Sequence, residues 1–180
     1  MSISINKDEL VQLLRNGEIE KFNNLRHFSE ETPLDLTESD LNHMNIVGAN
    51  LSRVDLSGSD LSKSEFESID FNYSDLSSVN FSHTTIIESN FIEVILEGSL
   101  FNNACVVKSD FTEVDFNGIN ACGANLADAD LSLAKNLMQA VYDTETIWPD
   151  DDLLPNDFEP QENVSFANFD DKDEYPEEQF

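Results

Sequence analysis

The side chains that could carry chemistry are few and widely spaced along the chain. The three histidines are His27, His43 and His83, and the two cysteines are Cys105 and Cys122. Histidine and cysteine can bind a metal ion, but their ligand bonds are only about 2 Å long, so the side chains must meet at one point. Carboxylates are abundant, since 37 of the 180 residues are aspartate or glutamate. They can perform general acid–base catalysis where a cleft shifts a pKa. What these groups can do depends on the elements that position them.

The charge of the chain is strongly unbalanced. Only 9 lysine and arginine residues accompany the acidic ones, and the formal net charge is −28. Nucleic acid and anionic membranes repel such a chain, so we expect neither to bind it, and we expect a protein partner with a basic surface. No apolar run approaches the roughly 20 residues that span a membrane. No signal peptide is visible, and two cysteines make no disulfide framework. We therefore expect a cytoplasmic location.

A five-residue repeat runs through the middle of the chain. Every fifth residue from Leu36 to Leu131 is apolar, over 20 consecutive positions without an insertion. The residue before it is aspartate or asparagine in 15 of the 20 cases, and the residue two before is usually small. Five residues turn an α-helix through about 500°, and side chains on a strand alternate with period two, so neither element fits. A short extended piece that turns once per repeat does fit, with the small and apolar residues inside.

The repeat has a recognisable form. Typical steps are Ala49-Asn50-Leu51, Val54-Asp55-Leu56 and Ser59-Asp60-Leu61. This A(D/N)LXX pattern resembles the pentapeptide-repeat family. The resemblance implies an all-β solenoid, a right-handed quadrilateral β-helix with four repeats per coil and about five coils. The flanks are similar to those of cyanobacterial members, which often carry motifs like Phe22-Asn23-Asn24-Leu25-Arg26 and Tyr142-Asp143-Thr144-Glu145-Thr146-Ile147-Trp148-Pro149.

The composition divides the chain into four parts. Residues 1–33 read as a helical cap, in which Asn6 caps a first helix, Asn16-Gly17 ends it, and a second helix covers residues 18–28. Residues 34–135 form the β-helix, and residues 136–149 form a closing segment. We expect the acidic residues 150–180 to be a disordered tail. This tail is either a solvated linker or an acidic, aromatic segment that docks on a partner.

With four repeats per coil, residues at the same position of every fourth repeat stack in columns. One interior column is an aromatic ladder in a packed core, formed by Leu51, Phe71, Phe91, Phe111 and Leu131. Two outward columns are acidic, with Asp70, Asp110 and Asp130 on one face and Asp55, Asp75 and Asp115 on the next, where Ile95 interrupts them. These carboxylates either bond local backbone and keep the protein soluble, or they form an acidic docking face.

One stretch breaks the rule that outward residues are polar. Its members are Ile87, Ile92, Ile95, Leu100 and Val107. A contiguous apolar patch often marks an interface, whereas scattered apolar residues are normal on a surface. We therefore predict an interaction patch here. It would form a homodimer or contact another partner, with cover by the tail or closing segment and harmless exposure as the alternatives.

The columns also separate the residues that could carry chemistry. His43 and His83 share a corner column but lie two coils apart, roughly 10 Å, which is too far for one metal ion. Cys105 and Cys122 point outward on adjacent faces, which favours free thiols. The carboxylates line a convex face instead of a cleft, and neither a glycine-rich phosphate loop nor a nucleophile elbow occurs in the sequence. We expect no catalytic residue, no metal, no cofactor and no enzyme.

Two functions remain. The first is a non-enzymatic interaction or regulatory scaffold module, which presents flat acidic faces and a small apolar patch to a protein. The second follows from the resemblance, because some pentapeptide-repeat proteins resemble duplex DNA and bind type II topoisomerases such as gyrase. Residues 36–135 hold 16 acidic and 4 basic residues over roughly five coils. That charge density is near that of DNA, but the length matches only about 7 base pairs. We favour the interaction module.

Overall fold

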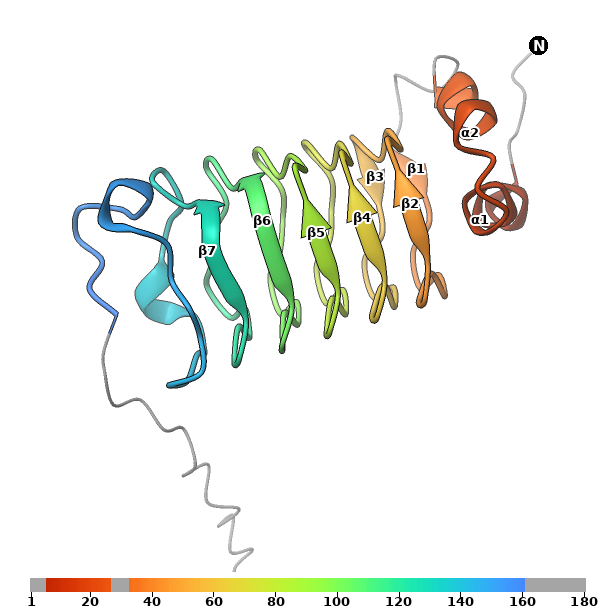
Figure 1. Ribbon diagram of the computed structural model, residues 1–180. Helices are drawn as coiled ribbons and strands as arrows, with labels where there is room; N and C mark the ends of the chain where they lie inside the picture. The colour runs from red at the N-terminus through yellow and green to blue at the C-terminus, as the bar shows by residue number, and fades with distance from the viewer. Residues whose placement is uncertain (1–5, 27–32, 161–180) are drawn as a thin grey trace, which may run out of the picture.

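The computed structural model describes residues 6–26 and 33–160. Two helices stand at one end of an elongated solenoid, and a short irregular segment closes the other end (Figure 1). His27 and the chain beyond residue 160 lie outside the described residues. Within these limits, no helix has the length and apolar character that would let it cross a membrane.

The first helix, α1 (Lys7–Arg15), is followed by α2 (Ile19–Arg26). Asn6 caps α1, since its side chain accepts a hydrogen bond from the Asp8 N–H at 3.1 Å. Gly17 follows α1 with a φ of +69°, a left-handed conformation in which glycine carries no steric penalty. Both helices and the cap therefore confirm the sequence prediction, and their inner face buries Leu10, Leu14 and Phe22.

Side chains from the helices take the place of a further coil at the N-terminal edge of the solenoid. The Asn23 amide accepts from the Asn50 N–H at 2.8 Å and donates to the Gly48 carbonyl at 2.9 Å. Lys7 and Arg15 donate to backbone carbonyls of the first coil. An exposed sheet edge is a template for unwanted pairing, so this cover protects the edge.

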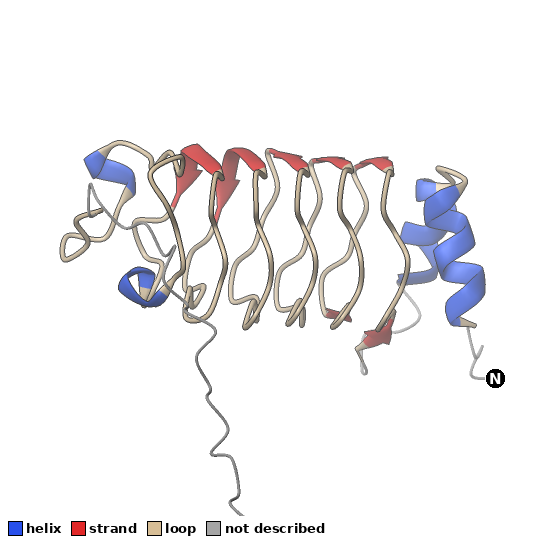
Figure 2. Cartoon of the chain, turned by 90° about the horizontal axis from the view of Figure 1, so that it is seen from below, coloured by secondary structure: helices blue, strands red, loops and turns tan. Residues whose placement is uncertain are grey.

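The solenoid consists of short parallel strands in two sheets. β1 (Leu34–Asp35) pairs with β3 (Val54–Asp55). The second sheet has the order β2-β4-β5-β6-β7, with bounds Asn45–Val47, Glu65–Glu67, Thr85–Ile87, Cys105–Asp110 and Asn125–Asp130. The two sheets lie at opposite edges of the coils (Figure 2). Ile46 pairs with Phe66, and Phe66 pairs with Ile86, so the register advances by four repeats per coil as predicted.

Each coil has four sides, which we number along the chain. In the first coil, side one comprises residues 35–38, and side two comprises residues 40–43. Side one contains β1 and β3. Side three comprises residues 45–48 of the first coil, and side four comprises residues 50–53. Side three contains the five-stranded sheet. Each side recurs at every fourth repeat, as the isolated bridges Asp40↔Asp60 and Asn50↔Asp70 show for sides two and four.

The interior is filled by stacked rings. Phe91 stacks between Phe71 and Phe111, with ring centroids 4.9 and 4.6 Å away, as the predicted ladder requires. A second stack joins Phe81 to Phe101 at 4.8 Å. Rings of the two stacks meet edge to face, for example Phe71 and Phe81 at 6.1 Å. The solenoid is therefore a packed core along its whole length.

The corners impose one unusual conformation. Every fifth residue from Glu38 to Gly123 has a positive φ, and most of these residues are not glycine. A left-handed conformation costs an L-residue about 1–2 kcal/mol. The contacts with the coils above and below must therefore offset this conformational free energy at each corner.

Buried serines connect neighbouring coils. The Ser74 hydroxyl accepts from the Val54 N–H at 3.1 Å and donates to the Leu51 carbonyl at 2.6 Å. In the coil below, the Val54 N–H would otherwise bond to the Leu51 carbonyl and close a turn. The Ser74 hydroxyl lies between these two groups. Ser59 and Ser64 make the same pair of bonds. The sequence analysis expected only a small residue here, and the hydroxyl adds hydrogen bonds between coils.

After Lys135 the register changes and the solenoid closes. Asn120 pairs with Val141, and Asn125 pairs with Ile147, so one and then two extra residues enter the last turn. Two 3-10 helices, η1 (Leu137–Gln139) and η2 (Asp151–Leu153), lie in this segment.

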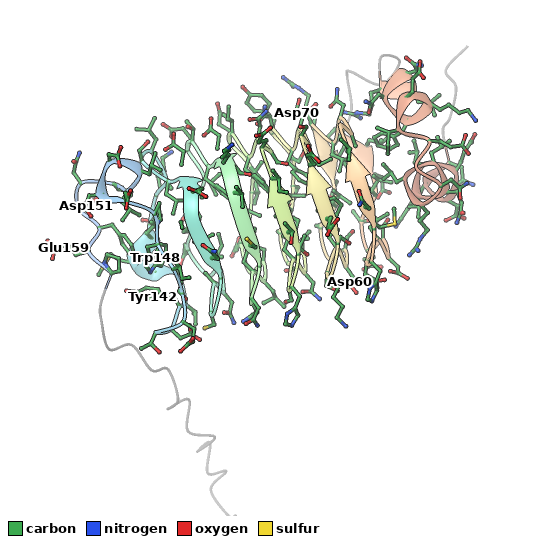
Figure 3. The ribbon with its side chains drawn as sticks, in the orientation of Figure 1. Asp60, Asp70, Tyr142, Trp148, Asp151 and Glu159 are labelled. Atoms are coloured by element: carbon green, nitrogen blue, oxygen red, sulfur yellow. The ribbon has the colours of Figure 1, made fainter. Side chains whose placement is uncertain are left out.

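The closing segment is longer than the sequence analysis predicted. Residues 150–160, which we expected to begin a disordered tail, pack against the last coil and bury Leu154 and Phe158. The Phe158 ring contacts the Trp148 ring at 4.8 Å, and Tyr142 meets Trp148 edge to face at 5.2 Å (Figure 3). These aromatic contacts, which lie beyond the five-residue repeat, are the physical reason for the correction.

The serine bridges predict a contrast between two buried serines. Ser74→Ala should destabilise the protein by about 0.5–1.5 kcal/mol, because it removes the hydrogen bonds between coils and the Val54 N–H and Leu51 carbonyl must then shift to close their own turn. Ser99→Ala is the matched control. Within the described residues the Ser99 hydroxyl is buried without a partner, and the coil below closes its own turn from the Val79 N–H to the Leu76 carbonyl. Urea unfolding measures both, and equal losses would contradict the bridging role.

Candidate protein-interaction face

The structure brings the predicted acidic residues onto two adjoining sides. Asp55, Asp75 and Asp115 lie on side one, and Asp70, Asp110 and Asp130 lie on side four. The two sides meet at a corner column formed by Arg53, Tyr73, Glu93, Glu113 and Leu133. We call sides four and one together the acidic face. Asp60, on side two, projects at the opposite edge from Asp70 (Figure 3).

Each predicted aspartate of the acidic face accepts a hydrogen bond from the following turn. The Asp55 Oδ1 atom accepts from the Ser57 N–H at 3.0 Å, and the Asp115 Oδ1 atom accepts from the Asn117 N–H at 2.9 Å. Asp70, Asp75, Asp110 and Asp130 make the same bond. In Asp35 this bond and the Thr37 hydroxyl lower the carboxyl pKa below its ordinary value. The predicted bonding to local backbone is therefore confirmed, and docking stays a prediction.

The charge is unevenly distributed around the coil. Of the 17 acidic residues from 35 to 130, 11 lie on the acidic face. On side two the charged residues are Asp40, Asp60 and Lys63. The protein thus has one strongly acidic half and one nearly neutral side.

The predicted apolar patch does not form. Each five-residue repeat advances the coil by one side, so members of the patch fall on different sides. Ile87 and Val107 stack on side three, where they pair in the sheet. Ile92 follows on side four, Ile95 pairs in the Asp75 column of side one, and Leu100 pairs in the Asn80 column of side two. A homodimer through these five residues as one surface is therefore not supported by their arrangement.

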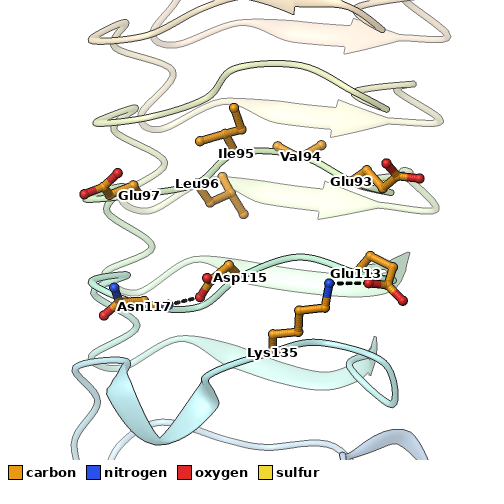
Figure 4. A pocket seen from close by; sticks show the side chains of 9 residues that line it. All are labelled: Glu93, Val94, Ile95, Leu96, Glu97, Glu113, Asp115, Asn117 and Lys135. Atoms are coloured by element: carbon orange, nitrogen blue, oxygen red, sulfur yellow. Dashed lines mark hydrogen bonds and ion pairs between the residues drawn. The ribbon is translucent and has the colours of Figure 1, made fainter.

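The structure groups Ile95 with acidic residues instead. A hollow of about 650 Å³ lies on side one, and we call it the Ile95 hollow (Figure 4). Its lining comprises Glu93, Val94, Ile95, Leu96, Glu97, Glu113, Asp115, Asn117 and Lys135. Ile95 is 54 % exposed. The sequence carried a signal for this hollow, because Ile95 interrupts an aspartate column, but its apolar character grouped it with residues that lie on other sides.

A lysine from the next coil reaches into the Ile95 hollow. Lys135 pairs with Asp115 in the backbone ladder, and its ammonium group forms an ion pair with the Glu113 carboxylate. The bond to Glu113, its charge, and the charges of Asp115 and Glu93 raise the Lys135 pKa above its ordinary value. The hollow therefore already accommodates one organic cation.

The histidines and cysteines are kept apart. Cys105 on side three and Cys122 on side two are free and half-buried. Burial, together with the nearby Asp143 carboxylate, raises the pKa of the Cys122 thiol. Within residues 6–26 and 33–160, no group of three or more histidine, cysteine or acidic side chains is placed to hold a metal ion.

The raised pKa of Cys122 predicts slow alkylation. At a given pH a higher pKa leaves less thiolate, which is the reactive form. The rate of modification by iodoacetamide, followed by mass spectrometry as a function of pH, should give a Cys122 pKa above the ordinary range of about 8–9. Asp143→Asn keeps an acceptor for its backbone partners but removes the charge, so it should lower that pKa. A Cys122 pKa within or below that ordinary range would contradict the described environment.

Comparisons with known proteins agree with this architecture. The family model for pentapeptide repeats matches eight copies, over residues 35–72, 64–103, 74–112 and 109–135. A search of curated protein sequences finds no match.

Solved structures provide further similarities. HetL, a pentapeptide repeat protein involved in heterocyst differentiation regulation from the cyanobacterium Nostoc, is 27 % identical with a TM-score of 0.51. That match covers 67 % of this chain and 56 % of HetL, so this chain spans little more than half the length of HetL. A pentapeptide repeat protein from the Arabidopsis thaliana thylakoid lumen is 16 % identical (TM-score 0.45, covering 54 % of this chain and 65 % of that one). Rfr23 from the cyanobacterium Cyanothece is 21 % identical (TM-score 0.45, covering 72 % and 99 %).

The family model spans more than half of the chain, and the observed coils follow the same five-residue period. The chain belongs to the pentapeptide-repeat family.

Proposed function

We propose that this protein is a non-enzymatic interaction or regulatory scaffold module, and that it binds a basic surface of a partner protein through the acidic face. The observation that carries the proposal is the concentration of acidic residues on two adjoining sides. Charge that served solubility alone would have no reason to avoid side two. Opposite charge steers a partner toward such a face and fixes its orientation.

The choice of aspartate over asparagine supports the same conclusion. Asparagine makes the same turn bond, as the Asn80 and Asn120 side chains on side two do with the residues two positions later. Neighbouring aspartates in one column lie about 4.8 Å apart and repel each other. The turn therefore does not require the negative charge that Asp55 and Asp75 place on side one.

Binding suits these carboxylates better than catalysis. The Oδ1 atoms of Asp55, Asp75 and Asp115 are already engaged by backbone N–H groups. General acid–base catalysis needs a side chain that is free to exchange a proton with a reacting group, and these oxygens are held by the turn instead. HetL is described as involved in regulation, which is compatible with a protein that acts by binding.

The uneven charge also favours a protein partner over imitation of DNA. Duplex DNA is charged along both strands and therefore around its whole circumference. Here side two carries Asp40, Asp60 and Lys63, a formal net charge of only −1. A topoisomerase groove that surrounds DNA would meet this neutral side as well as the acidic face.

The acidic face can be tested by replacing charge without disturbing the turns. A variant with Asp55, Asp75 and Asp110 changed to asparagine keeps each turn acceptor and removes three charges. The matched control changes Glu65, Glu67 and Glu88 on side three to glutamine. In a quantitative pull-down, proteins retained by the wild type should also be retained by the control and lost by the acidic-face variant.

Two results would contradict the proposal. Equal retention by all three proteins would show that the acidic face does not bind the partner. Inhibition of gyrase supercoiling at micromolar protein, equally reduced by both variants, would favour the DNA-mimic alternative.

A further inference from the structure

We propose that the Ile95 hollow is the recognition pocket of the acidic face, and that it binds a partner segment in which an apolar side chain is flanked by lysine or arginine. This inference rests on the proposed function, because it assumes that the acidic face binds protein. It adds where on the acidic face the partner binds and which side chains the partner segment carries. It also identifies the residue of this chain that competes with the partner.

The first observation is that Ile95 stands where an aspartate would stabilise the fold. In the coils on either side, Asp75 and Asp115 accept from the N–H two residues later. An isoleucine side chain has no acceptor for the Glu97 N–H. The sequence therefore gives up a turn hydrogen bond and exposes an apolar side chain. Local stability does not explain this choice, whereas an apolar contact with a partner does.

The second observation is that acidic groups surround Ile95 on its exposed side. Glu93 and Glu113 follow each other along the corner toward side four, and Glu97 lies on the other edge of side one (Figure 4). Asp115 lies one coil beyond Ile95. The result is an apolar floor with carboxylates on three sides, which complements an apolar side chain between cationic ones.

The third observation is that the chain places its own cation there. The Lys135 ammonium group pairs with Glu113, and the alkyl stem of Lys135 rises from the next coil between Asp115 and Glu113 (Figure 4). This shows that a lysine side chain fits the rim. It also means that a partner cation must compete with Lys135 for Glu113, so Lys135 weakens binding in the free protein.

Leu100 provides an internal comparison. It interrupts the column of Asn80 and Asn120 on side two as Ile95 interrupts the aspartate column, and it is 39 % exposed. However, the charged residues of side two are Asp40, Asp60 and Lys63, none of which lies in the coil of Leu100. The two positions thus present similar apolar side chains in different electrostatic surroundings.

The test uses a fluorescein-labelled peptide with the sequence Lys-Arg-Leu-Arg-Lys and a second peptide with serine in place of leucine. Fluorescence anisotropy with the full chain should show that both bind more weakly at high salt and that the leucine peptide binds several-fold more tightly. Ile95→Asn keeps the net charge and restores a turn acceptor, so it should fold at least as stably and abolish the preference for leucine. Leu100→Asn is the matched control and should retain it.

Lys135 is tested in the same assay. Lys135→Gln removes the competing ammonium group and should strengthen binding of the leucine peptide about two- to fivefold, the range expected for losing an exposed ion pair. Lys135→Arg keeps the cation and should leave affinity near that of the wild type. Weaker binding by Lys135→Gln would contradict the competition.

The outcomes separate this inference from the proposed function. Salt-sensitive binding that is equal for both peptides and unchanged by Ile95→Asn would overturn the Ile95 hollow and leave the acidic face as the binding surface. Binding of neither peptide at any salt concentration would overturn both. Equal loss of the leucine preference in Ile95→Asn and Leu100→Asn would also overturn the hollow, because the two positions differ in their acidic surroundings.

Discussion

The structure depends on the hydrogen-bond register that joins each coil to the next. The Leu56 N–H bonds to the Asp75 carbonyl of the following coil, and the Asp75 N–H bonds back to the Val54 carbonyl. Bonds in these two directions, repeated along the solenoid, hold every coil at four repeats. A shift by one residue would turn inward side chains outward, so the apolar period and the backbone ladder must agree. The phenylalanine stack around Phe91, the aspartate columns and the Ile95 hollow all follow from this register.

The same register places carboxylates of equal charge above one another. The repulsion between them is smaller than the free energy of the hydrogen bonds that they accept. Two carboxylates about 4 Å apart repel by about 1 kcal/mol in water. A hydrogen bond to a charged acceptor contributes about 1.5–3 kcal/mol. The turn bonds of Asp55 and Asp75 therefore outweigh the repulsion along side one. Asparagine would avoid the repulsion but keep only a neutral bond of about 0.5–1.5 kcal/mol, so the two residues differ little in local stability. The clustering of the charge on sides four and one is what calls for a functional explanation.

The sequence predicted the parts of the molecule that are periodic or local. The five-residue period predicted the coils, the interior column of Phe91 and the two acidic columns, and the capping residue Asn6 predicted the start of α1. The sequence did not predict contacts between residues on different sides of the coil or contacts beyond the repeat. Grouping Ile87 with Ile95 ignored that each repeat advances the chain by one side. The closing segment depends on Trp148 and Phe158 meeting after the register has changed, which no five-residue pattern encodes. The cation in the hollow depends on the path of the Lys135 side chain, which only the coordinates show.

The central claim is that a basic partner binds at the Ile95 hollow on the acidic face. The most direct measurement is the change in backbone amide chemical shifts when the leucine peptide is added to the isotope-labelled protein. Binding in the hollow should produce changes centred on Glu93, Ile95 and Glu113, with sides two and three unaffected. Changes concentrated on side two or three, or spread evenly around the coils, would contradict it.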